Sequence, residues 1–235
     1  MKKSIVGIIG AMDQEVEGLI AAMQDKMVHR KAGMEFYRGT LFGKDAVVVK
    51  GGVGKVSAAL CTQILIDCFY VTIVINTGAA GSLSPNVKIG DMVIATELVQ
   101  HDMDSVDFGF PLGQIPFLDT FAFEADKKMV SLAGETAFEC FPDLRVHKGR
   151  VCTGDEFVAK KERKEWIVST FGGLCTEMEG GAVAQTAYLN GIPFIVLRAI
   201  SDEADDSATV DFPTFSKKAS EISIELIKAM FAKIE

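Results

Sequence analysis

The chain has 235 residues, of which 49% are hydrophobic, and its 24 Lys and Arg face 32 Asp and Glu, a net charge of −8. This size and apolar content predict one folded domain over residues 1–235 and exclude extensive disorder. The acidic balance argues against a nucleic-acid partner, because the one basic cluster, at 160–164, contains a glutamate and is typical of a solvated helix face. No apolar run approaches the roughly 20 residues that a membrane span needs.

The apolar pattern alternates between strands and helices along the whole chain. In chain order it predicts a strand at 4–10, a helix at 13–23, strands at 35–41 and 46–50, a helix at 53–68, strands at 71–76 and 91–101, a helix at 126–140, a strand at 146–153, a helix at 160–170, a strand at 174–177, a helix at 180–189, a strand at 193–200 and a helix at 215–234. Strands that alternate with helices predict an α/β sheet covered on both faces.

The first residues and the cysteines indicate the cellular compartment of the protein. Two lysines and a short apolar run resemble a signal peptide, but Asp13 and Glu15 end the run early, so a buried first strand explains it better. The five cysteines form no CxxC pair, which is typical of reduced thiols in a core. We therefore expect a cytoplasmic protein.

A long segment at 101–119 combines Gly and Pro turns with aromatic residues, as functional loops do. Its apolar side chains either cover the core of the same chain or mark an interface. These side chains are Phe108, Phe110, Pro111, Leu112, Ile115, Pro116 and Phe117. We expect a C2 homodimer in which this loop completes the site of the neighbouring subunit.

Three motifs that resemble known binding sites are incomplete. Gly54-Lys55 resembles the end of a phosphate-binding loop, but Val49 stands where the loop needs its first Gly, and Val56 where it needs Ser or Thr. The glycine-rich turn expected at 77–81 lacks the GxGxxG spacing of a dinucleotide site. His101-Asp102-x-Asp104 is a weak metal pattern that polar residues at a strand end explain as well. The sequence therefore predicts no metal and no cofactor.

Three carboxylates follow apolar strands, at the edge where α/β sheets bind ligands. Glu15 comes after the first strand, Glu179 after the strand at 174–177, and Asp202 after the strand at 193–200. A single carboxylate at such a position is often only a helix cap. Three of them, each beside small residues that leave room for a ligand, favour a binding site.

Five segments carry a specific resemblance to a known family. In chain order they are GAMDQEV, NTGAAGS, TGDEFV, EMEGGAVAQ and RAISDEAD. They resemble the corresponding segments of the methylthioadenosine/S-adenosylhomocysteine nucleosidases, which belong to the nucleoside phosphorylase superfamily. The resemblance spans essentially the whole chain and implies a three-layer sandwich in which helices flank a central mixed sheet. It also implies hydrolysis of 5'-methylthioadenosine and S-adenosylhomocysteine, and also of 5'-deoxyadenosine, to adenine and the 5-substituted ribose, a step of methionine salvage and of the recycling of S-adenosylmethionine by-products.

The resemblance assigns a role to each residue of the expected site. Glu15 corresponds to the base that activates water, and Asp202, oriented by Ser201, corresponds to the acid that protonates N7 of adenine. Family members have an apolar residue where this chain has Ser105, a departure that concerns the pocket for the 5' substituent. The other implied contacts are Glu179 and Met178 at the ribose, Phe157 and Val158 at the adenine, Ala79, Ala80 and Gly81 at the sugar and the water, Met12, Val53 and Phe212 at the 5' substituent, and Phe108 and Pro116 from a second subunit.

These residue types suit cleavage of an N-glycosidic bond. One carboxyl group neutralises the leaving base while another carboxylate activates water on the opposite face of the sugar, as in an inverting glycosidase. A third carboxylate at the ribose hydroxyls orients the sugar and favours its growing positive charge.

Two other functions are compatible with the same fold. Phosphorolysis requires a cradle for a dianion, but Asn76 and Ala79 occupy the positions where related phosphorylases carry an Arg and a Ser, so hydrolysis is favoured. A non-catalytic nucleoside-binding protein would not need all three carboxylates. The sequence does not rank methylthioadenosine against S-adenosylhomocysteine, 5'-deoxyadenosine or 6-amino-6-deoxyfutalosine.

Overall fold

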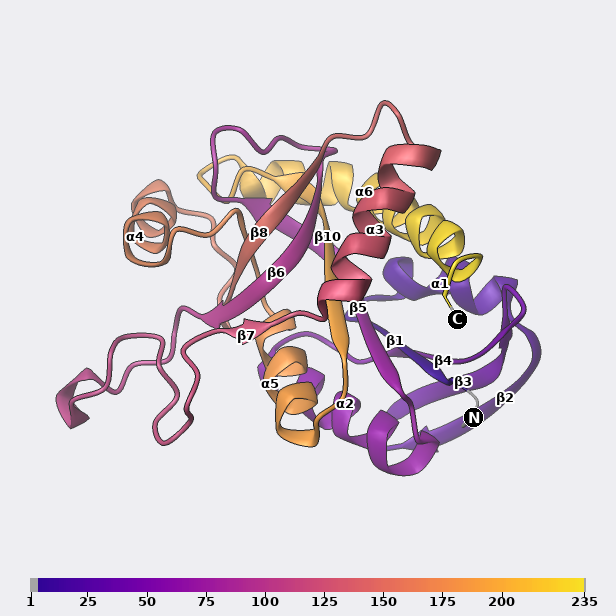
Figure 1. Cartoon of the computed structure of the whole chain (residues 1–235). Coiled ribbons are helices and arrows are strands. Elements are labelled where there is room, and N and C mark those ends of the chain that lie inside the picture. The colour runs from indigo at the N-terminus through magenta and orange to yellow at the C-terminus, as the bar shows by residue number, and fades with distance from the viewer. Residues whose placement is uncertain (1–3, 235) are drawn as a thin grey trace.

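The computed structural model describes residues 4–234 (Figure 1). The strands are β1 (Val6–Gly10), β2 (Gln24–Lys31), β3 (Met34–Leu41), β4 (Lys44–Lys50), β5 (Ile73–Ser82), β6 (Met92–Gln100), β7 (Phe123–Glu124), β8 (Val146–Thr153), β9 (Cys175–Glu177) and β10 (Phe194–Asp202). The helices are α1 (Asp13–Ala22), α2 (Lys55–Phe69), the short 3-10 helix η1 (Val106–Phe108), α3 (Lys127–Cys140), α4 (Lys161–Phe171), α5 (Gly180–Asn190) and α6 (Ala208–Phe231).

Ten strands within residues 4–234 form one mixed sheet. Its path runs β10-β6-β8-β9-β5-β1-β4-β3-β2, with β7 beside β6. A further pairing of β10 with β5 closes the first five strands of this path into a ring. Strand β5 consequently has three neighbours, β1, β9 and β10, so that its C-terminal half lies at the centre of the molecule.

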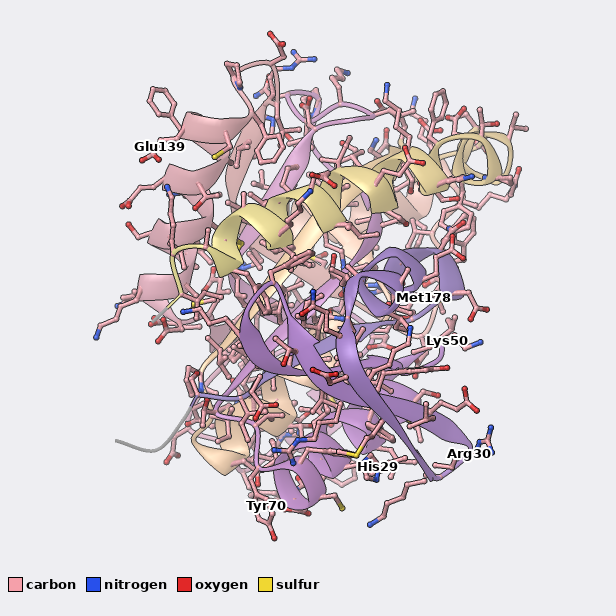
Figure 2. All side chains as sticks on the ribbon, turned by 90° about the vertical axis from the view of Figure 1, so that its right-hand side faces the viewer. His29, Arg30, Lys50, Tyr70, Glu139 and Met178 are labelled. Carbon is pink, nitrogen blue, oxygen red and sulfur yellow. The ribbon has the colours of Figure 1, made fainter. Side chains whose placement is uncertain are left out.

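Helices cover the sheet on both faces, as the alternating pattern predicts. Helices α2 and α5 pack together on one face, and Cys61, Leu65 and Val183 belong to the core that they share with the sheet. Helix α6 packs against α1 and α3 on the other face, where Leu19 and Leu226 belong to a second core. Figure 2 shows α6 lying across this face. The expected α/β sandwich with a central mixed sheet is confirmed.

Two of the expected strands end later than the sequence predicts. Strand β5 continues to Ser82, so the turn expected at 77–81 is part of the strand. Backbone pairing explains this, because Arg198 to Ile200 of β10 pair with residues 78–80 along this stretch. Asp202 is likewise the last residue of β10 and does not follow it.

Three further expectations need correction. Strand β2 was not expected, because its eight residues are all exposed and show no apolar alternation. Helix α6 begins at Ala208, seven residues before the expected start, with Pro213 inside its first turns. The cluster at 160–164 is only partly solvated, since the Arg163 guanidinium lies 4.2 Å from the centre of the Trp166 ring.

Two remaining expectations concern the position of the cysteines and membrane-spanning segments. Cys61, Cys152 and Cys175 are buried free thiols, whereas Cys68 and Cys140 are exposed, so the expected core position is wrong for these two. Among the described helices, none is long and apolar enough to cross a membrane.

Candidate active site

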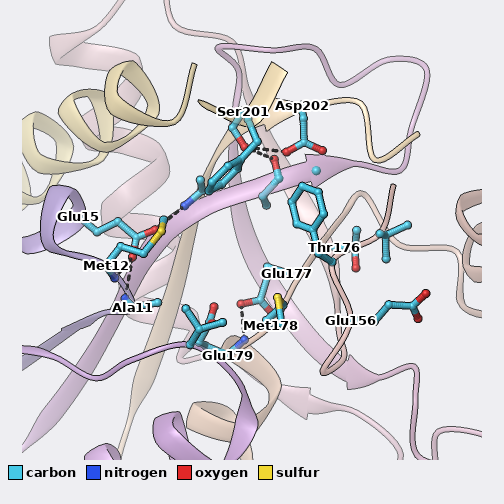
Figure 3. Close-up of a pocket in the computed structure, with 17 residues that line it drawn as sticks. Ala11, Met12, Glu15, Glu156, Thr176, Glu177, Met178, Glu179, Ser201 and Asp202 are labelled. Atoms are coloured by element: carbon cyan, nitrogen blue, oxygen red, sulfur yellow. Dashed lines mark hydrogen bonds between the residues drawn. The ribbon is translucent and has the colours of Figure 1, made fainter. Parts of the chain in front are cut away.

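A cavity of about 240 Å³ opens at the carboxyl ends of β1, β5, β9 and β10. Glu15, Glu179 and Asp202 come from three different elements and face this one space (Figure 3). Thirteen of the fifteen residues expected at the site line it. The complete lining is Ala11, Met12, Glu15, Val53, Ala79, Ala80, Gly81, Glu156, Phe157, Val158, Thr176, Glu177, Met178, Glu179, Ser201, Asp202 and Phe212.

Glu15 is fixed by backbone amides at the start of α1. Its Oε2 accepts hydrogen bonds from the amides of Ala11, at 2.6 Å, and Met12, at 3.0 Å, while its Oε1 accepts from the amide of Ala79 at 3.2 Å. A carboxylate in the third position of a helix satisfies free N–H groups there, which explains why the sequence places it here. Burial nevertheless raises the pKa of Glu15, against the opposing effects of Arg198 and these amides. A carboxylate with a raised pKa is a better proton acceptor for water.

Asp202 is held at a β-bulge. Ile200 pairs with Ala80 and Asp202 with Gly81, so Ser201 is an extra residue in β10. The Ser201 hydroxyl donates to Asp202 Oδ2 at 2.8 Å, and the amide of Ala204 donates to Asp202 Oδ1 at 2.9 Å. Burial raises the pKa of Asp202, which favours the protonated form that a general acid requires.

Glycines next to the two carboxylates leave room for them. A Cβ at Gly81 would lie 2.6 Å from Asp202 Oδ1, and a Cβ at Gly78 would lie 2.9 Å from Glu15 Oε1. Both distances are shorter than van der Waals contact, so a larger residue would displace the carboxyl group. The glycines of β5 are therefore part of the site.

Glu179 precedes α5 and lines the cavity (Figure 3). Its Oε1 accepts a hydrogen bond of 2.9 Å from the amide of Gly54, at the start of α2. Burial and then the negative charge of Glu177 raise the pKa of Glu179 to about 7. Hydrogen bonds from the hydroxyl groups of a ligand would stabilise the ionised form of this buried carboxyl group.

Two aromatic side chains form one wall of the cavity. The rings of Phe157 and Phe212 meet edge to face with their centres 5.7 Å apart. Val53 and Met12 add apolar surface nearby. Such a wall suits a flat heteroaromatic ring, because stacking requires an apolar face of similar size.

Two expected residues do not reach the cavity of their own chain. Phe108 and Pro116 lie in the loop between β6 and β7, which extends away from the rest of the molecule (Figure 1). Phe108 is 84% exposed and Phe117 is 92% exposed. Part of the loop does pack on its own chain, since Leu112 contacts the core beneath α4.

Four lining residues were not expected from the sequence: Ala11, Glu156, Thr176 and Glu177. Glu177 is the most notable, because its carboxylate is buried together with the guanidinium of Arg198. An arginine inside an otherwise apolar strand needs a buried acidic partner, and that requirement is the signal that the sequence offers. No Lys, Arg or His of residues 4–234 lines the cavity.

Comparisons with known proteins agree with this geometry. The family model described as the phosphorylase superfamily matches residues 5–232. The 5'-methylthioadenosine/S-adenosylhomocysteine nucleosidase of an Exiguobacterium species is 41% identical over 98% of both chains. This chain belongs to that nucleosidase family.

Solved structures extend the comparison with the nucleosidase family. The Neisseria meningitidis nucleosidase in complex with methylthio-immucillin-A superposes with a TM-score of 0.95, at 36% identity over 98% of this chain and 100% of that one. A structure described as the futalosine hydrolase of Helicobacter pylori superposes with a TM-score of 0.94, at 36% identity over 98% of each chain.

Proposed function

We propose that this chain hydrolyses the N-glycosidic bond of 5'-methylthioadenosine and S-adenosylhomocysteine, releasing adenine and the 5-substituted ribose. The observation that carries the proposal is the convergence of Glu15, Glu179 and Asp202 on one cavity with an aromatic wall. Membership of the nucleosidase family supports the same reaction. Such a reaction belongs to methionine salvage and to the removal of by-products of S-adenosylmethionine.

The proposed mechanism assigns one step to each carboxyl group. Asp202, protonated and oriented by Ser201, gives its proton to N7 of adenine as the bond between C1' and N9 breaks. Glu15 takes a proton from the water whose oxygen forms the new bond to C1'. Each positioned proton transfer contributes about 10²–10⁴-fold to the rate. Glu179 accepts hydrogen bonds from the ribose hydroxyls and stabilises the positive charge that develops on the sugar.

The remaining lining residues bind the two ends of the nucleoside. We assign stacking on adenine to Phe157 and contact with the purine edge to the backbone of Val158. Ala79, Ala80, Gly81 and Met178 border the sugar and the water, while Met12, Val53 and Phe212 surround the 5' substituent. An apolar 5' pocket accepts a thioether better than a phosphate or a free hydroxyl.

Water is a better nucleophile for this site than phosphate. No lysine or arginine of residues 4–234 lines the cavity to bind a dianion, and the ionised Glu177 and the carboxylate that Glu15 provides as base would repel it. Arg198, which contacts the lining residue Glu177, is engaged by that carboxylate and by Asn76 Oδ1. We therefore place the chain with the hydrolases of its superfamily.

Adenine release in phosphate-free buffer tests the proposal. The substrates are methylthioadenosine, S-adenosylhomocysteine, 5'-deoxyadenosine and 6-amino-6-deoxyfutalosine, the last because of the similarity to the futalosine hydrolase. We expect turnover of the first two without phosphate. An absolute phosphate requirement would establish a phosphorylase, and tight adenine binding without turnover would establish a binding protein.

We also propose a homodimer in which Phe108 and Pro116 complete the neighbour's 5' pocket. The support is the exposed apolar loop together with a cavity that lies open where Val53 is 53% exposed. Sedimentation at nanomolar concentration with parallel activity measurements tests it, since a fully active monomer would contradict it. We further propose that residues 1–235 act as one catalytic domain in the cytoplasm, where the reduced thiols are stable.

A further inference from the structure

Glu177 has a buried carboxylate that the proposed mechanism does not use. Its side chain is 2% exposed, and that of Arg198 is 1% exposed. The Arg198 guanidinium donates to Glu177 Oε2 through both Nε, at 3.1 Å, and Nη2. A buried ion pair of this kind contributes little net stability, because removing both charges from water costs about as much as their attraction gains. A role in the site is therefore a better explanation for the pair than stability.

The same carboxylate holds the start of α5. Glu177 Oε2 accepts hydrogen bonds from the amides of Glu179, at 3.1 Å, and Gly180, at 2.7 Å. Its Oε1 accepts from the Thr153 hydroxyl, which in turn accepts from the amide of Gly181 at 2.7 Å. Glu177 thus fixes the backbone of Glu179, whose side chain faces the cavity (Figure 3).

Arg198 connects Glu177 to the surroundings of Glu15. A Cβ at Gly78 would lie 3.3 Å from Arg198 Nη1 and 2.9 Å from Glu15 Oε1, so both groups lie over the same glycine. Arg198 Nη2 also donates to Asn76 Oδ1 at 2.5 Å, and Asn76 Nδ2 donates to the carbonyl oxygen of Ile9, next to the loop of Glu15. The guanidinium therefore pairs directly with Glu177 and acts on Glu15 and Glu179 through its charge.

We propose, on the basis of the function proposed above, that Glu177 is a positioning residue of the reaction. It anchors Arg198 and the start of α5, and thereby sets both the place and the charge of Glu179 and Glu15.

The direction of the electrostatic effect follows from the charges. Although burial alone would raise it, the pKa of Glu177 is held below its ordinary value by Arg198 and by its hydrogen bonds, so this group stays ionised. Its charge raises the pKa of Glu179, whereas Arg198 lowers the pKa of Glu15 and of Glu179. Removal of the charge leaves Arg198 to act on those two groups alone, which lowers both pKa values.

The other titratable groups around Glu177 do not offset this change. Burial lowers the pKa of His101 and raises that of Cys152, to about 12, and that of Cys175, so all three favour their neutral forms. The groups that face the cluster are Glu15 from α1, His101 after β6, Cys152 from β8, Cys175 from β9, Glu179 before α5 and Arg198 from β10.

The experiment compares kcat and kcat/KM against pH for the full chain and three variants. Glu177→Gln keeps the shape and removes the charge; Glu177→Asp keeps the charge but is too short to hold Arg198 and α5 together. Glu97→Gln is the matched control, because Glu97 forms an ion pair of 2.7 Å with Arg150 outside the cavity. A parent that releases no adenine would refute the proposed function itself, independently of Glu177.

With an active parent, Glu177→Gln is expected to move the acid limb of kcat/KM down by about one pH unit. Its kcat/KM is expected to fall about 10–10²-fold, as small misplacements of reacting groups do. Glu177→Asp is expected to lower kcat while the acid limb of its kcat/KM profile stays at the pH of the parent. Glu97→Gln is expected to change neither kcat nor the pH of this limb. If the acid limb of kcat/KM in Glu177→Gln lies at the same pH as in the parent, the proposal is overturned. If this variant does not fold, the Asp variant decides, since a parental kcat there would overturn it.

Discussion

The role proposed for Asp202 can be separated from a purely structural one by Asp202→Asn. Asp202 Oδ1 accepts from the Ala204 amide at 2.9 Å, and Oδ2 accepts from the Ser201 hydroxyl at 2.8 Å. Asparagine keeps an oxygen for the first bond. The amide nitrogen of the asparagine can donate to Ser201 Oγ. The Ser201 hydroxyl can then donate to the carbonyl oxygen of Ala80, which lies 3.4 Å away. Shape and hydrogen bonding are retained, but no transferable proton remains.

The two roles predict effects on different quantities. Loss of a general acid lowers kcat by about 10²–10⁴-fold, or about 2.7–5.4 kcal/mol of transition-state stabilisation. The same variant should change the free energy of unfolding by less than about 0.5 kcal/mol. Asp202→Ala loses both hydrogen bonds and should cost about 1–3 kcal/mol of stability, at about 0.5–1.5 kcal/mol for each bond.

The assay measures kcat by adenine release and the melting temperature on the same preparation. Asp205→Asn is the matched control, because Asp205 accepts from the Ser207 amide in the adjacent turn and lies outside the cavity. We expect parental kcat in the control. Near-parental turnover with a lowered melting temperature in Asp202→Asn would make Asp202 a turn-forming residue and would remove the general acid from the mechanism.

Three further outcomes follow from the site. A 2'-deoxy substrate leaves Glu179 short of a donor, so its kcat/KM should fall by up to about 10⁴-fold, and equal values for the two sugars would contradict the role of Glu179. The pKa of Glu179 is raised from 4.5 to about 7, so the folded chain binds a proton that the unfolded chain has lost in this range. The contribution of Glu179 to the free energy of unfolding is therefore fully present below pH 4.5 and falls by about 3 kcal/mol towards pH 7. Thermal unfolding should show it as a difference in pH dependence between the parent and Glu179→Gln, and identical pH dependence would contradict it. Gly81→Ala would place a Cβ 2.6 Å from Asp202 Oδ1 and displace the carboxyl group, so kcat should drop about 10–10²-fold. Calorimetry should still detect binding of adenine. A parental kcat would show that the carboxyl group has room to move.

The order of elements and the strand-end carboxylates were accessible from the sequence for physical reasons. Buried strands such as β1 are continuous apolar runs, and the carboxyl ends of neighbouring strands meet at one edge of a sheet. The sequence thus places Glu15, Glu179 and Asp202 at strand ends, but whether they converge depends on the order of the strands in the sheet, which the structure supplies. The exposed strand β2 could not be found in this way, because its position depends on pairing with β3 and not on burial.

The remaining parts of the site depend on contacts between distant segments. Glycine-rich residues 77–81 have the composition of a turn, and only the pairing with β10 keeps them extended. The Glu177–Arg198 pair joins residues 21 positions apart, and neither position shows by itself that the other is its partner. Whether Phe108 and Pro116 meet a neighbouring subunit depends on a surface that one chain does not contain.

The β-bulge in β10 places a limit on how this family member can vary. In a regular strand, consecutive side chains point to opposite faces, and a shift of one residue reverses every one of them. The extra residue, Ser201, sets the direction of Asp202 through the length of the strand rather than through the chemistry of its neighbours. The apolar residues of β10 can therefore exchange with others of similar volume, whereas the gain or loss of one codon between Ile200 and Asp202 turns the acid away from its substrate.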